Sequence, residues 1–195
     1  ALIKFKKESD LLVNYCFQDN YKLLDCKTKS FSQFMNKEHY SKQLANYCDF
    51  LMKMELKGKN DDQIEDYLQD VINIFRCVTN KVVFQYEYVK KLSERMLNKK
   101  TVSIVAEKNL ISKLKAEQGV TYVNRFSSIF EDLEKSDSLN DRFRKNKESS
   151  FGKPSGIDFN CKVLQNGAWE IDSMREFKFG IKTLSPALFF CQTVW

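Results

Sequence analysis

The chain has 195 residues, of which 43% are hydrophobic and 30% charged, with 32 Lys and Arg against 26 Asp and Glu. This composition is typical of a soluble globular chain of one or two domains, and it excludes the disordered and fibrous classes. A chain of this length buries roughly 70% of the surface that its unfolded form exposes, so its core needs neither disulfides nor a metal. The net charge of +6 is spread along the chain and singles out no acidic partner or nucleic acid.

The six cysteines are scattered and form no C-x-x-C pair, which argues against a zinc site and against a small disulfide framework. We therefore expect free, mostly buried thiols. No stretch approaches 18 apolar residues, and residues 1–10 do not lead into the apolar core of a secretory signal. These features predict no membrane span and a location in the cytoplasm and/or the nucleus.

The distribution of helix breakers divides the chain. Residues 1–150 contain no proline and two glycines, whereas the rest contains both prolines and four glycines. The first part is therefore predicted to be helical. Apolar residues recur there at helical spacing in five stripes, within 44–52, 64–75, 84–96, 105–114 and 122–133.

Stop and start signals separate these stripes. Gly58 can end the first helix in a left-handed conformation, and Asn60 or Asp61 can cap the next helix by accepting hydrogen bonds from its free N–H groups. Gly119 supplies a stop after the fourth stripe. The first two stripes are therefore predicted to form a helical hairpin.

The helical part is predicted to end shortly after the fifth stripe. Ser136 or Asp137 would cap a short last turn, and residues 142–150 have no buried apolar pattern and are expected to be an exposed linker. The basic residues of this stretch either belong to a solvated linker or steer an acidic partner.

The last part has the pattern of strands. Apolar and polar residues alternate over 157–163, the pair Asn166-Gly167 would turn the chain, and residues 177–181 alternate again. Because a lone β-hairpin is marginally stable in water, this small sheet needs a partner. The predicted fold is mainly α, a helical bundle followed by a small incomplete α+β segment with a β-hairpin.

Residues for catalysis are sparse. The one histidine, His39, has no neighbours at the spacing of a catalytic site, so we interpret it as a loop or helix-end residue. No glycine-rich phosphate loop is present, and the aromatic residues follow helical stripes instead of alternating with basic residues on strands. We therefore predict no enzyme, catalytic residue, cofactor or metal, and no nucleic-acid partner.

Three segments carry a resemblance to a known family. Residues 110–115, followed by Gly119 and Tyr122, resemble M-I-S-K-L-K…C-G…Y; the stretch 130–143 resembles M-F-x-D-I-x-x-S-x-x-L-N-x-x-F; and residues 159–169 resemble F-S-V-x-V-L-x-x-G-x-W-P, with Glu170 in place of the proline. In this order and spacing the segments resemble the cullin family, with a pattern closest to the cullin-1 type. Residues 44–49 and 75–97 resemble the family as well.

The resemblance implies a scaffold of a multisubunit ubiquitin ligase that acts in ubiquitin-dependent protein degradation. It divides the chain into residues 1–40, the end of a cullin-repeat-like helical region; residues 41–148, a four-helix-bundle-like region; and residues 149–195, a partial α/β segment. It also implies a RING-finger subunit as the partner. We expect no adaptor binding, because the family's adaptor-binding repeats would precede residue 1, and no residue here matches the acceptor of the ubiquitin-like modifier.

The predicted partner site is the first strand, 158–164. An incomplete sheet has an open edge, and an extended segment of the partner can add a strand there through main-chain hydrogen bonds. Phe159, Cys161 and Val163 would fill the core-facing side of this strand, and Trp169 would anchor the turn on the bundle. The candidate RING-binding residues are Phe159, Cys161, Val163, Leu164 and Trp169.

Two hypotheses about function remain open at this point. The first is a non-catalytic cullin-like scaffold that binds a RING subunit. The second is a diverged cullin fragment or competitor that keeps the helical bundle but assembles no active ligase.

Overall fold

The computed structural model describes residues 2–18, 20–146 and 160–170. Within these residues the chain is mainly helical up to residue 146, and two helices end in π-helical turns, η1 (Leu12–Cys16) and η2 (Leu51–Glu55). The α-helices are α1 (Leu2–Leu11), α2 (Tyr21–Phe34), α3 (Glu38–Phe50), α4 (Asp61–Cys77), α5 (Lys81–Leu97), α6 (Ile104–Gln118) and α7 (Val120–Asn146).

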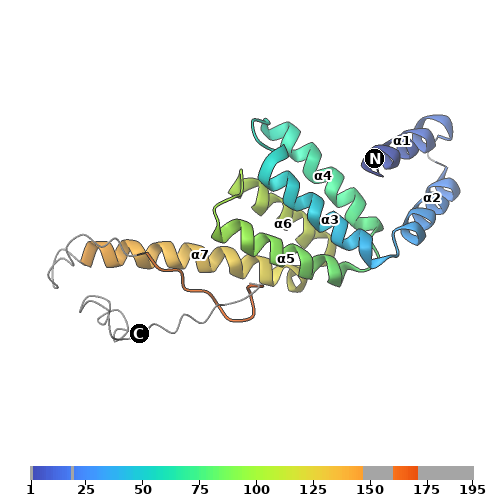
Figure 1. The fold of residues 1–195 in the computed structure, drawn as a ribbon. Coiled ribbons are helices and arrows are strands. Elements are labelled where there is room, and N and C mark those ends of the chain that lie inside the picture. Colours follow the sequence, from blue (N-terminus) through green and yellow to red (C-terminus); the bar gives the residue numbers. More distant parts are fainter. Residues whose placement is uncertain (1, 19, 147–159, 171–195) are drawn as a thin grey trace.

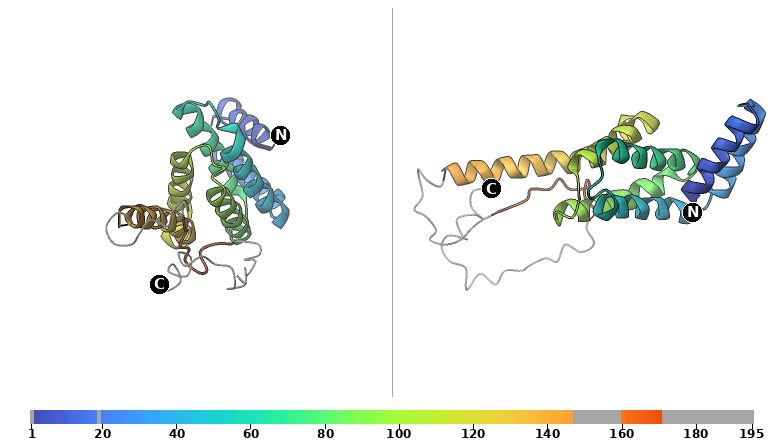
Figure 2. Two further views of the ribbon diagram at one scale, coloured as in Figure 1. Left: turned by 60° about the vertical axis from the view of Figure 1, so that its left-hand side comes forward. Right: turned by 90° about the horizontal axis from the view of Figure 1, so that it is seen from above.

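The described elements form a helical bundle with extensions at two ends. Helix α3 packs mainly against α5, α6 packs against α4 and α7, and α5 also contacts α7. The pair α1 and α2 lies at one end of the bundle, and the second half of α7 projects from the opposite end (Figure 1). The view from above shows the same arrangement, with α7 extending well beyond the other helices (Figure 2). The prediction of a mainly α fold with a helical bundle is confirmed.

The predicted apolar stripes form one core. Leu68, Phe75, Phe84 and Leu92 are fully buried, together with the apolar residues that share their helix faces. The fourth stripe was predicted wrongly at its first residue. Val105 is 68% exposed, and Ala106 is buried in its place. Ala106, Leu110 and Leu114 lie four residues apart and therefore share one face of α6, whereas Val105 points about 100° away from that face.

The predicted helix ends are confirmed. Asn60 caps α4, and its side chain accepts a hydrogen bond from the Gln63 N–H while the Gln63 side chain accepts one from the Asn60 N–H. Gly58 has a φ of +75° in the turn before α4, and Gly119 caps α6 with a φ of +85°. Both values lie in the region that favours glycine.

The predicted break after the fifth stripe is wrong. Helix α7 runs without interruption from Val120 to Asn146, so neither Ser136 nor Asp137 is a cap, and 142–146 belongs to the helix instead of a linker. The Ser136 hydroxyl donates to the Asp132 C=O at 2.7 Å, which satisfies it inside a continuous helix. The predicted hairpin lies largely outside the described residues, and 160–170, its described part, contains no strand.

Candidate partner-binding site

The second half of α7 changes from an apolar to a polar buried face. Phe130 and Leu133 are its last contributions to the apolar core. The buried polar side chains are Asp132, Ser136 and Asn140, with 6%, 0% and 4% of their surface exposed. Because residues four apart lie above one another on a helix, these three form a line along one face of α7. We call them the α7 ladder.

The α7 ladder binds the main chain of residues 160–165, which run beside α7 (Figure 1). Every second residue of this segment donates its N–H to one ladder side chain. The hydrogen bonds are Cys161 N–H to Asn140 Oδ1 (3.0 Å), Val163 N–H to Ser136 Oγ (2.9 Å) and Gln165 N–H to Asp132 Oδ2 (2.7 Å).

The spacing of these bonds shows that the segment is extended. Four residues of an α-helix advance by about 6 Å, and two residues of an extended chain span about 6.6 Å, so the two repeats match. Successive N–H groups of an extended chain point in opposite directions. The N–H groups of Lys162 and Leu164 therefore point away from α7, and within the described residues they have no hydrogen-bond partner.

The segment continues into a turn that is fixed to the bundle. Gly167 has a φ of +83° in this turn, where the sequence predicts one. Trp169 packs against the core and donates its Nε1–H to Asp132 Oδ2 at 2.8 Å. Glu170 accepts a hydrogen bond from Arg125 at 2.6 Å. The bundle thus fixes both the main chain and the anchoring tryptophan that the sequence predicts.

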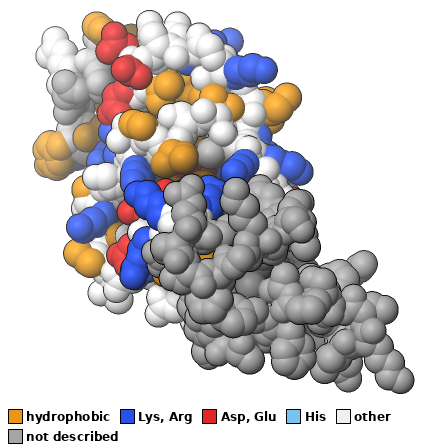
Figure 3. Space-filling model, turned by 90° about the vertical axis from the view of Figure 1, so that its left-hand side faces the viewer, with side chains coloured by type: hydrophobic (Ala, Val, Ile, Leu, Met, Phe, Trp, Pro, Cys, Tyr) orange, Lys and Arg blue, Asp and Glu red, His pale blue; other side chains and the backbone are white. Residues whose placement is uncertain are grey.

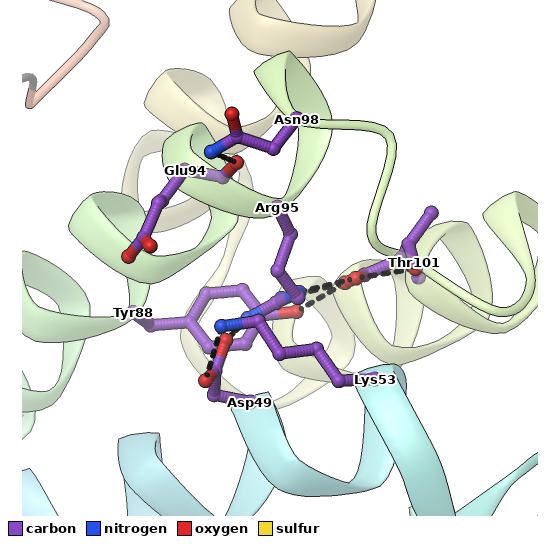
Figure 4. Close-up of polar contacts among 8 residues, drawn as sticks. Asp49, Lys53, Tyr88, Glu94, Arg95, Asn98 and Thr101 are labelled. Atoms are coloured by element: carbon purple, nitrogen blue, oxygen red, sulfur yellow. Dashed lines mark hydrogen bonds and ion pairs between the residues drawn. The ribbon is translucent and has the colours of Figure 1, made fainter.

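A buried ionic cluster supports the neighbouring end of the bundle (Figure 4). Arg95 of α5 and Glu107 of α6 have no exposed side-chain surface and form two hydrogen bonds, of 2.8 and 3.0 Å. Arg95 also contacts Asp49 of α3 at 2.8 Å, while the hydroxyls of Tyr88 and Thr101 donate to the Glu107 carboxylate. The cluster therefore joins α3, α5, α6 and the connection before α6.

Within this cluster, the polar partners of Arg95 and Asp49 outweigh the effect of burial, which by itself would favour the neutral form. Burial alone would lower the pKa of Arg95, but the Glu107 carboxylate and the other acceptors outweigh burial and raise it. Burial alone would raise the pKa of Asp49, but hydrogen bonds from Lys53 and Arg95 hold it below its usual value. Every charge thus has a partner, so we interpret the cluster as a structural support.

An open cavity of about 510 Å³ lies between α7 and the connection from α5 to α6. Its apolar lining includes Met96, Val102 and Phe130, and the side chain of Lys162 from the extended segment borders it. Lys and Arg side chains gather on this end of the molecule, beside the residues drawn in grey (Figure 3).

The structure brings four of the five candidate residues together in the extended segment and its turn, and the fifth, Phe159, lies outside the described residues. The expectation that Cys161 and Val163 fill the core is wrong. Val163 is 43% exposed, and Cys161 is half-buried. The reason is that α7 binds the main chain of these residues, so their side chains are not directed into an apolar core.

The role of the α7 ladder was missed at the sequence level, although its residues stand in the family-like stretch 130–143. A usable signal was present. Asp132, Ser136 and Asn140 extend the four-residue spacing of the stripe 122–133 with polar residues. Buried polar residues on a helix need partners, and the extended segment supplies them.

Two other predictions concern isolated residues. His39 lies exposed in the first turn of α3, as a helix-end residue. The described cysteines are free thiols as predicted, but Cys16 and Cys26 are exposed, whereas Cys48 and Cys77 are buried. In the part of the chain that the structure describes, no helix is long and apolar enough to cross a membrane, and no cluster of potential ligands could hold a metal.

Comparisons with known proteins agree with the fold. Residues 1–140 match the family model described as Cullin alpha solenoid domain. The chain is 31% identical over 170 residues to Cullin-4A of Mus musculus and 30% identical over 171 residues to Cullin-4A of Homo sapiens, in each case 86% of this chain and 22% of the relative. It is 33% identical over 172 residues to Cullin-4 of Dictyostelium discoideum, 87% of this chain and 21% of that protein.

The chain spans about a fifth of the length of these curated relatives. They are cullin-4 proteins, and the expected closeness to the cullin-1 type stays a prediction. The family match covers well over half of the described residues, including the bundle and all three residues of the α7 ladder. The family match, the helical bundle and the motifs of its last two helices together show that this chain belongs to the cullin family.

Proposed function

We propose that the chain is a non-catalytic cullin-like scaffold that binds a RING-finger subunit of a cullin–RING ubiquitin ligase. One observation carries the proposal: the α7 ladder fixes an extended segment whose N–H groups at Lys162 and Leu164 point outward. An outward main-chain edge is what a partner's extended segment needs in order to add a strand. The curated relatives are cullins, which supports the choice of partner.

The proposed contribution to ubiquitin transfer is position, not chemistry. A rigid bundle that binds a RING subunit raises the effective concentration of the reacting groups without supplying a nucleophile. The proposal includes the division into residues 1–40, 41–148 and 149–195. It also includes action in the cytoplasm and/or nucleus, and no nucleic-acid or membrane partner.

A proline at residue 162 tests the outward edge. Lys162→Pro removes the outward N–H but restricts residue 161 to extended conformations, which it already has. Lys162→Ala is the matched control, because it removes the charge and the side chain but keeps the N–H. In a titration with a RING-finger subunit, we expect the proline variant to bind at least ~10-fold more weakly than the alanine variant. The reason is that an acceptor in the interface loses its donor.

Equal affinity of the two variants would overturn the proposed edge. A complete lack of binding by the unaltered chain would overturn the scaffold function and favour the second hypothesis, a diverged cullin fragment or competitor that assembles no active ligase. Circular dichroism of each variant shows whether the helices remain intact.

A further inference from the structure

Burial requires that the polar atoms of the α7 ladder have partners, but it does not require that these partners be main-chain atoms. Each of its side chains contacts main-chain atoms of the segment. Asn140 accepts from the Cys161 N–H and donates to the Cys161 C=O, and Ser136 lies 2.9 Å from the N atom and 3.2 Å from the carbonyl O of Val163. Main-chain contacts of this kind fix where the chain lies without depending on the identity of its side chains.

One ladder residue also fixes the register. Asp132 Oδ2 accepts both the Gln165 N–H and the Trp169 Nε1–H. A slip of the segment by one residue would turn the N–H of Leu164 toward Asp132 and separate residue 165 from it. Because extended chains alternate with a period of two, such a slip would exchange the inward and outward groups along the whole segment.

We propose that Asp132, Ser136 and Asn140 are positioning residues that hold residues 160–165 in one register and so decide which amides face a partner. The link to a RING subunit rests on the proposed function, whereas the fixed register does not. In this role the ladder acts through the segment and contacts no partner itself. The partner would bind the N–H groups of Lys162 and Leu164, which point away from α7 only in this register.

Amide hydrogen exchange of the full chain, followed by NMR, tests the register without any partner. We expect an alternating pattern, with slow exchange at Cys161, Val163 and Gln165 and fast exchange at Lys162 and Leu164. Ser136→Ala should raise the exchange rate of the Val163 amide by about fivefold, the effect of one lost hydrogen bond. Amides of the bundle core should be unchanged.

Two matched controls lie on the same helix. Ser138 and Asn124 are exposed residues of α7, so Ser138→Ala and Asn124→Ala should leave the pattern unchanged. Asn140→Ala is the second test variant. It should raise the exchange rate of the Cys161 amide, whereas its control, Asn124→Ala, should not. If the five amides of the segment exchange alike, or if Ser136→Ala and Asn140→Ala both leave them unchanged, the proposal is wrong.

A titration with a RING-finger subunit separates this proposal from the proposed function. If both hold, Ser136→Ala lowers affinity by about fivefold and Ser138→Ala does not. An alternating exchange pattern in a chain that binds no RING subunit would support the fixed register and overturn the proposed function. Full affinity of Ser136→Ala despite a released segment would overturn the positioning role.

Discussion

At the scale of single residues, Arg95 is a charged side chain that is shielded from water and has several polar partners. Its guanidinium lies between Glu107 and Asp49, and no part of its side chain is exposed. Taking two charges out of water costs several kcal/mol per ion, and their attraction compensates only when the geometry is good and the remaining polar atoms are satisfied. The hydroxyls of Tyr88 and Thr101 complete this set.

Arg95→Met should therefore destabilise the bundle by about 3–5 kcal/mol, because Glu107 would stay buried without its cation. Denaturant unfolding followed by circular dichroism measures the loss. Arg76→Met is the matched control: Arg76 pairs with Glu117 at 2.6 Å, but its side chain is 55% exposed. Screening by water limits that pair to about 0–1 kcal/mol.

The double variant Arg95→Met, Glu107→Leu should recover most of the lost stability, since it leaves no buried charge unpaired. A loss for Arg95→Met no larger than that of the Arg76 control would contradict the account of the cluster.

At the scale of the element, α6 and α7 meet at a single residue. Gly119 caps α6 with a φ of +85° and a ψ of 176°, and α7 begins at the next residue. This combination of angles is essentially restricted to glycine. A Cβ at this position would meet no atom within 4 Å, so any cost of a larger residue comes from the backbone alone.

Gly119→Ala should consequently lower the free energy of unfolding by about 1–3 kcal/mol, the cost of a non-glycine residue in this conformation. The measurement is a denaturant titration, in which the midpoint should fall with little change of slope. Gln118→Ala, at an exposed neighbouring position, should have little effect. An unchanged midpoint for Gly119→Ala would show that the connection adopts another conformation.

The sequence was sufficient to predict the helices and several of their ends, because these depend on local patterns. The stripe 84–96, the cap at Asn60 and the stop at Gly119 each follow from spacing or backbone preference. The length of α7 did not follow, because Ser136 is a typical cap residue, and its place inside a helix is explained by its contacts with the Asp132 C=O and the Val163 N–H.

At the candidate site, the sequence predicts an extended chain but not its orientation toward the bundle. Alternation over 157–163 indicates which side chains share a face of an extended chain, but it does not say whether a neighbour contacts a face or an edge. In the structure the neighbour is a helix that contacts the edge, and Val163 is therefore exposed. Only the tertiary arrangement of α7 and the segment contains this information.

At the scale of the whole molecule, the bundle supports a long helix, and that helix supports an extended segment. The core ends at Leu133 of α7, the ionic cluster braces the adjoining helices, and α7 continues past the bundle (Figure 2). The α7 ladder begins where the apolar core ends. A partner bound to the segment would thus be held at a fixed position relative to the bundle, as a scaffold requires.

The most direct test of the central claim is the amide exchange of the full chain with and without a RING-finger subunit. The account predicts that exchange slows at Lys162 and Leu164 when the partner is added, because these outward N–H groups acquire acceptors. Slowing that is confined to other surfaces, such as α1 and α2, or an unchanged rate at both residues in a chain that binds the partner, would contradict it.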